Sequence, residues 1–344
     1  MVQELTYQSK FTGAEIDARL KAVENAVMTI EQTLSESQKA QARENIDVVG
    51  GGEVANLIKF MRNEKMRREY LTFTGTEDGG TLRLVVNGDE DSDFMDDNIL
   101  VSKNGGEWGS VHFAGDGEYT LATFNRGDVI RVKGDGVFSA RYSDDMGEDA
   151  YFSFSSDKKM EISGNVMSVY YNDDFVDKFS VADGSVEGLD DDYWMQCGHM
   201  FEGGENFNIN PIRPLVLPAT TLASSCYHSM FIGCTGLTSA PELPATTLAD
   251  YCYYSMFSGC TGLTSAPELP TTTLASSCYR SMFSGCTGLN YVKCLATNIS
   301  ASNSHKDWLK DVAATGTFVK AAGMSSWPTG ADGIPSGWTV EDAA

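Results

Sequence analysis

Histidine and cysteine are the residues of this chain with the greatest potential for catalysis or metal binding. Its 344 residues include four histidines and eight cysteines. The histidines are dispersed and form no HExxH motif, and the GxSxG and GxxxxGK[ST] motifs are also missing. No two cysteines have the CxxC spacing that a zinc site favours. We therefore expect no enzyme activity, no catalytic residue, no metal site and no cofactor.

Carboxylates leave two alternatives open. Two Asp or Glu side chains at a suitable distance form a glycosidase pair, and a sequence does not show distance, so a glycan-degrading enzyme is our third alternative. Asp89, Asp91 and Asp93 match the first half of an EF-hand loop. Phe94 and Leu100 occupy its glycine and glutamate positions, which excludes an EF-hand and leaves open calcium bound by a β-sandwich loop.

A repeat of 26 residues dominates the second half of the chain. Nearly identical units begin at Leu217, Leu243 and Leu269, and a period of this size predicts a solenoid. Each unit has a short extended piece and a helix-like piece, Ala223 to Cys234, whose apolar residues are buried by stacking the units. Residues 200–203 echo residues 230–233 and predict a degenerate preceding repeat. The cysteines recur in two registers, where we expect free, buried thiols in preference to disulfides.

The run CxxSMFxGCTGLTSAPELPATTLA resembles the cysteine-containing leucine-rich repeats of BspA-like surface proteins of Bacteroidetes and their tailed phages (crAss-like or related). The resemblance covers about 100 residues. It implies a curved strand-and-helix solenoid that binds a partner and has no catalytic machinery.

One column of the repeats varies while its surroundings stay constant. It reads His228, Tyr254 and Arg280, and beside it Asp250 and Tyr251 replace serines. Tyr and Arg are favoured in binding hot spots, so these five residues are our candidate receptor-binding site for a bacterial surface glycan or protein. Drift on a solvated surface is the alternative.

Residues 13–34 have a heptad pattern of apolar residues, which predicts a coiled coil. Leucine at a and β-branched residues at d disfavour a parallel dimer, so we expect a homotrimer; a single amphipathic helix is the alternative. The predicted oligomerisation residues are Ile16, Leu20, Val23, Val27, Ile30 and Leu34. Downstream, residues 34–46 resemble an element found near the start of phage tail-fibre and appendage proteins, which implies contact with other virion proteins.

Residues 71–190 alternate apolar with other residues between glycine-rich turns, which predicts an antiparallel β-sandwich of eight or nine strands. This acidic region contributes most of the formal net charge of −23. Such a charge repels nucleic acid and anionic membranes, so we expect neither as a partner. We also expect no membrane insertion, because no apolar run is long enough.

The predicted fold class is thus multidomain, with a helical coiled coil, an all-β sandwich and an α/β leucine-rich-repeat solenoid. The predicted segments are a helical anchor (1–52), a connecting helix (53–70), the sandwich (71–190), the repeats (191–294) and a C-terminal cap (295–344). The segment before the heptads lacks the layout of a secretion signal. We therefore expect a virion fibre protein, on head or tail, assembled in the host cytoplasm. A bacterial surface adhesin is the second alternative.

Overall fold

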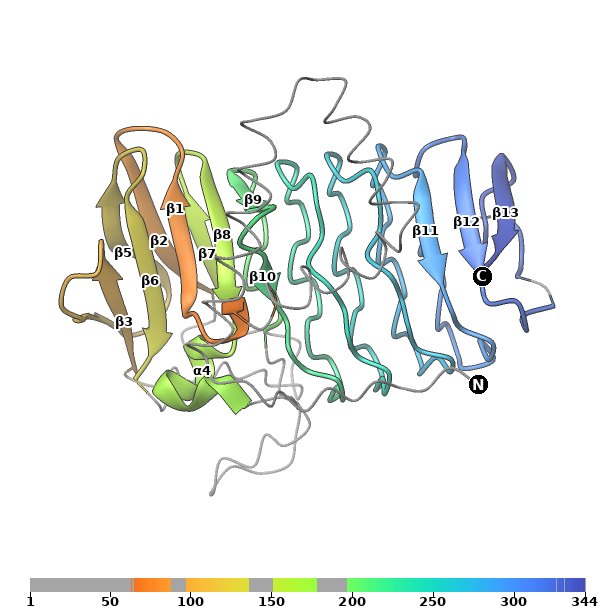
Figure 1. The fold of residues 1–344 in the computed structure, drawn as a ribbon, viewed down its shortest axis with the longest axis horizontal. Coiled ribbons are helices and arrows are strands. Elements are labelled where there is room, and N and C mark those ends of the chain that lie inside the picture. The colour runs from red at the N-terminus through yellow and green to blue at the C-terminus, as the bar shows by residue number, and fades with distance from the viewer. Residues whose placement is uncertain are drawn as a thin grey trace, which may run out of the picture.

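The computed structural model describes residues 63, 65–87, 97–135, 151–177, 197–325, 327–330 and 332–343. Its strands form three sheets within these ranges (Figure 1). The largest sheet has the order β10-β8-β1-β6-β3-β4, with β9 also paired to β8, and the second has the order β5-β2-β7. The strands of the first are β1 (Leu71–Gly75), β3 (Asp97–Lys103), β4 (Gly109–Phe113), β6 (Val129–Gly134), β8 (Met160–Asn165), β9 (Phe207–Ile209) and β10 (Leu215–Val216). Those of the second are β2 (Gly80–Asn87), β5 (Gly117–Phe124) and β7 (Tyr151–Ser156).

Strand β2 shows why these residues form sheets. Leu82, Leu84 and Val86 are buried, and each alternates with a half-buried residue, as one face of a strand packed on a core requires. The strands β1 to β8 pair only antiparallel with one another. The two sheets meet through aromatic side chains, with 5.0 Å between the ring centroids of Phe73 and Phe154.

The repeats continue the larger sheet. Strands β9 and β10 both pair with β8 in parallel, with Met160 opposite Phe207 and Leu215 opposite Gly164. The following repeats lie side by side between β10 and the third sheet (Figure 1). One cluster of buried residues runs from the first sheet to the C-terminal tryptophans. The repeats are therefore stabilised by the sheet at one end of the stack.

The backbone of each repeat has an alternating hydrogen-bond pattern. The N–H groups of Ser229, Phe231 and Gly233 donate to carbonyls of the next repeat at 2.8–2.9 Å. The N–H groups of the residues between them, Met230 and Ile232, donate locally, three residues back. Ser229 and Gly233 have φ of 51° and 73°, in the left-handed region. Every second N–H thus points along the stack axis.

The predicted fold class is wrong. Helical residues in the described ranges are confined to 63, 65–67, α4 (Ser168–Tyr171) and the 3-10 helix η1 (Asn172–Asp177), so the repeats are not the strand-and-helix units of an α/β leucine-rich-repeat solenoid. An α-helix requires right-handed φ at every residue, whereas φ is positive at Ser225, Tyr227 and Ser229. The apolar spacing of the segment 223–234 does not distinguish the two backbones, because this alternating backbone, like an α-helix, returns a side chain to the same side about every four residues. The predicted coiled coil lies outside the described residues.

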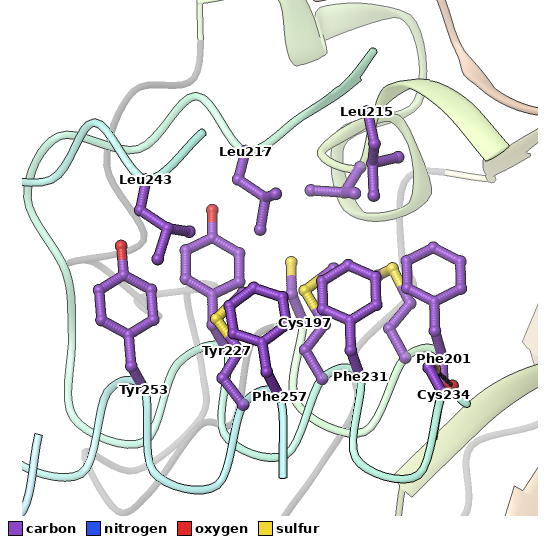
Figure 2. Packing of buried hydrophobic residues seen from close by; sticks show 14 of the residues in the cluster. Cys197, Phe201, Leu215, Leu217, Tyr227, Phe231, Cys234, Leu243, Tyr253 and Phe257 are labelled. Atoms are coloured by element: carbon purple, nitrogen blue, oxygen red, sulfur yellow. Dashed lines mark hydrogen bonds between the residues drawn. The ribbon is translucent and has the colours of Figure 1, made fainter. Parts of the chain in front are cut away.

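Stacking aligns equivalent aromatic rings inside the core (Figure 2). The rings of Phe201, Phe231, Phe257 and Phe283 follow one another at 5.3–5.5 Å and lie within 10° of parallel. Phe201 joins this column from the degenerate repeat, and its N–H donates to the Met230 carbonyl. The nearly constant spacing of the ring centroids shows that the repeats stack in register.

The predicted burial of the cysteines is confirmed, since all eight are buried as free thiols. In one register the thiol donates to a carbonyl of the preceding repeat: Cys234 to Phe201 at 2.9 Å, and Cys260 to Phe231 at 3.0 Å. Burial raises the pKa of the Cys234 thiol to about 12. These thiols fill the core and satisfy backbone acceptors.

A parallel sheet closes the far end of the stack. Its strands are β11 (Tyr291–Cys294), β12 (Gly316–Lys320) and β13 (Trp338–Asp342). Trp308, Trp327 and Trp338 are at most 8% exposed, and the first two stack at 5.1 Å. These buried rings fill the core at this end of the stack.

A substitution at Gly262 tests how closely the backbones of successive repeats approach each other. A Cβ at this position would lie 2.8 Å from the Thr235 carbonyl oxygen and 2.9 Å from that of Leu237. We expect Gly262→Ala to lower the free energy of unfolding by about 1–3 kcal/mol, because the backbones must move apart. Urea denaturation measures the change. The control is Gly323→Ala, where the added Cβ would meet only the Thr297 methyl at 3.9 Å; an equal loss in both variants would contradict the close packing.

Candidate functional site

The alternating backbone turns one side chain of each repeat outward in a column, here called the outward ladder: His228, Tyr254, Arg280 and Lys306. Its register follows from the N–H groups of Ser229, Ser255 and Ser281, which donate to the carbonyls of Tyr254, Arg280 and Lys306. The first three side chains of the ladder are half-buried and Lys306 is exposed. The structure therefore brings three of the five predicted site residues into one line, and adds Lys306.

The ladder residues stack on one another. The rings of His228 and Tyr254 lie 4.8 Å apart and within 14° of parallel. The Arg280 guanidinium carbon lies 5.4 Å from the centroid of the Tyr254 ring, a cation–π contact. Neighbouring residues thus cover the ring faces, and a partner would meet ring edges and polar groups.

Tyr251 and Asp250 flank the ladder differently. Tyr251 is 44% exposed, and its ring centroid lies 6.1 Å from that of Tyr254. The Asp250 carboxylate accepts a hydrogen bond from the Ser276 N–H at 2.9 Å. Tyr251 is therefore available to a partner, whereas Asp250 fastens one repeat to the next.

A polar cluster lies where the ladder meets β7. His199 Nδ1 is 2.7 Å from Glu202 Oε2, and His199 Nε2 is 3.3 Å from His228 Nδ1. Because His199 donates to the carboxylate through Nδ1, its Nε2 accepts from His228 when both rings are neutral. The Tyr151 ring of β7 stacks on His199 at 4.2 Å.

Burial governs the electrostatics of this cluster. Burial and the neighbouring His199 lower the pKa of His228 to about 4, although Glu202 acts in the opposite direction. Burial acts to raise the pKa of Glu202, but hydrogen bonds from His199 and Tyr151 and the charge of His199 outweigh it, and the pKa is lowered. The cluster favours a neutral His228 beside an ionised Glu202.

The sequence motifs do not reveal this cluster, because its histidines are 29 residues apart along the chain. The echo of residues 230–233 in residues 200–203 was the available signal, since it places His199 level with Ser229, next to His228. The six predicted oligomerisation residues, Ile16, Leu20, Val23, Val27, Ile30 and Leu34, lie outside the described residues.

The described ranges contain no group of three or more His, Cys, Asp or Glu arranged to hold a metal ion. Within the same ranges, no helix has the length and apolar character of a membrane span. Comparison of the chain with models of protein families, with curated proteins and with solved structures found no match. The site must therefore be interpreted from its own geometry.

His228 makes stability depend on pH. Its pKa is about 4 in the folded chain against 6.5 ordinarily, so between these values the unfolded state binds a proton that the folded state does not. The free energy of unfolding should therefore fall on acidification from pH 6.5 to 4, by on the order of 2 kcal/mol from this residue. We expect His228→Tyr, which copies the next residue of the ladder, to remove this part of the slope in urea denaturation across that range.

The matched control is His112→Gln, which removes an exposed histidine of β4, at the opposite edge of the first sheet from β10. The facing groups His199, Glu202, Tyr151 and Tyr254 stay unchanged in both variants. A wild-type slope in His228→Tyr would show that His228 does not carry the effect.

Proposed function

We propose that this chain is a structural fibre protein of a phage virion that attaches the particle to the bacterial surface through its repeats. The heptad residues of segment 1–52 form a trimer and join the fibre to other virion proteins. The repeats contact a surface glycan or protein. We propose no enzymatic activity for the chain.

The observation that carries this proposal is the contrast between a constant frame and a variable ladder. Residues that donate along the stack or fill its core are nearly identical in the three repeats, such as Ser229, Ser255 and Ser281. The outward ladder instead changes from His to Tyr to Arg to Lys. Folding does not fix the side chain at this column, because the frame tolerates several, so the column is free to be shaped by a binding partner.

The arrangement of the sheets and repeats supports an attachment role. The repeats extend from the sheets as a stack, so the ladder lies along an elongated face (Figure 1). In a trimer, three such faces would bind together, and avidity would strengthen weak individual contacts. The appendage-like element at residues 34–46 supports placement of the chain in a virion.

Location and adsorption test the proposal together. Antibodies against the chain should label purified phage particles, and the purified chain should compete with those particles for adsorption to host cells, because both use the same receptor. Electron microscopy with gold-labelled antibody and counts of unadsorbed phage measure the two effects. Heat-denatured chain is the control for competition.

Absence of the chain from particles would contradict the virion assignment. The same ladder would then serve an adhesin of the bacterium, and labelling of the cell surface would identify that case. Failure of the folded chain to compete, although it is present on particles, would contradict the attachment role.

A further inference from the structure

Three basic side chains gather at the C-terminal end of the outward ladder. Arg280 and Lys306 occupy successive positions of the ladder, and the bond from the Gly285 N–H to the Lys310 carbonyl places Lys310 in the parallel outward column after Ser284. We call Arg280, Lys306 and Lys310 the basic face. Lys306 and Lys310 are exposed and Arg280 is half-buried.

Ion pairs within the described residues do not neutralise the basic face. In the part of the chain that the structure describes, no carboxylate forms an ion pair with any of its three side chains, whereas Lys293 and Lys320 pair with Glu268 and Asp342. Asp307 and Asp311 alternate with the lysines in sequence, but within the described residues they form no ion pair with them. The face therefore offers three charges to an external anion.

The electrostatic surroundings oppose an anion least in the C-terminal part of the chain. Residues 71–200 carry 9 Lys and Arg against 27 Asp and Glu, whereas residues 201–344 carry 6 against 10. Residues 201–344 are thus much less repulsive to an anion than residues 71–200.

The spacing of the ladder indicates an extended polymer. Equivalent rings recur every 5.3–5.5 Å along the stack, a length comparable with one sugar unit of an extended polysaccharide. Arg280 and the lysines supply donors for carboxylates, and Tyr251 supplies an exposed ring for a sugar face. Nucleic acid fits less well, because base stacking needs several open rings and the ladder rings are covered.

We propose that the basic face, together with Tyr251 and Tyr254, binds a linear acidic polysaccharide whose carboxylates contact Arg280, Lys306 and Lys310. This inference rests on the proposed attachment function and names the chemical class of the receptor. The polymer lies along the stack axis, with successive sugar units over successive repeats.

Binding of the full chain to polygalacturonate, a linear uronate polymer, tests the inference. We expect binding that weakens as salt rises, with no comparable binding to neutral dextran. The triple variant Arg280→Gln, Lys306→Gln, Lys310→Gln should bind at least about tenfold more weakly, because three charge-assisted hydrogen bonds are lost. Tyr251→Ala should weaken binding without changing its salt dependence. Biolayer interferometry measures each affinity.

The control is a second triple variant, Arg126→Gln, Lys158→Gln, Lys159→Gln, which removes the same charge from exposed turns of the sheets. An equal loss in both triple variants would overturn the inference, because net charge alone would then explain binding. Failure of the wild-type chain to bind polygalacturonate would also overturn it. Equally tight binding of oligothymidylate would overturn the assignment to a polysaccharide.

Adhesion of the same variants to host cells separates this inference from the proposed function. If wild type and the basic-face variant adhere equally, attachment stands and the basic face is not its receptor site. If neither adheres but polygalacturonate binding still depends on the basic face, the anion site stands and the attachment function fails.

Discussion

The hydrogen bonds between successive repeats are the constraint on which the rest of the structure depends. In residues 229–233, every second N–H donates to a carbonyl of the next repeat. This pattern requires left-handed φ at residues such as Ser229 and Gly233. Left-handed φ costs a non-glycine residue on the order of 1 kcal/mol, and Tyr227 and Tyr251 also carry this cost. The paired N–H groups offset it, because a buried N–H without an acceptor costs more. Gly262 then lets neighbouring backbones approach closely enough for these bonds.

The same register produces both the core and the candidate site. Inside, it stacks Phe231 on Phe257; outside, it stacks His228 on Tyr254 with Arg280 beyond. Because outer rings cover one another, the ladder offers polar groups and charge in preference to open aromatic faces. Where the ladder meets β7, the same stacking buries His228 beside His199, which links folding to protonation.

Part of this arrangement is predictable from the sequence. The 26-residue period identifies the neighbour of each residue along the stack, and the alternation of Leu82, Leu84 and Val86 matches the buried face of β2. The backbone of the repeats is not predictable from apolar spacing, because a helix and the alternating left- and right-handed chain place side chains with a similar period. The pairing of β10 with β8 joins Leu215 to Gly164, and local sequence carries no signal for so distant a contact. Asp250 replaces a serine of the other repeats, as a partner-binding residue would, yet its carboxylate accepts a hydrogen bond from the Ser276 N–H. The sequence alone does not separate these two roles.

Hydroxyl-radical footprinting of the full chain on host cells tests most directly the claim that a constant frame presents a variable binding face. We expect cells to protect side chains with the period of the repeats, at His228, Tyr251, Tyr254 and Lys306, while exposed side chains of the sheets such as His112 stay equally oxidised. Protection centred on the sheets, or without the 26-residue period, would contradict it.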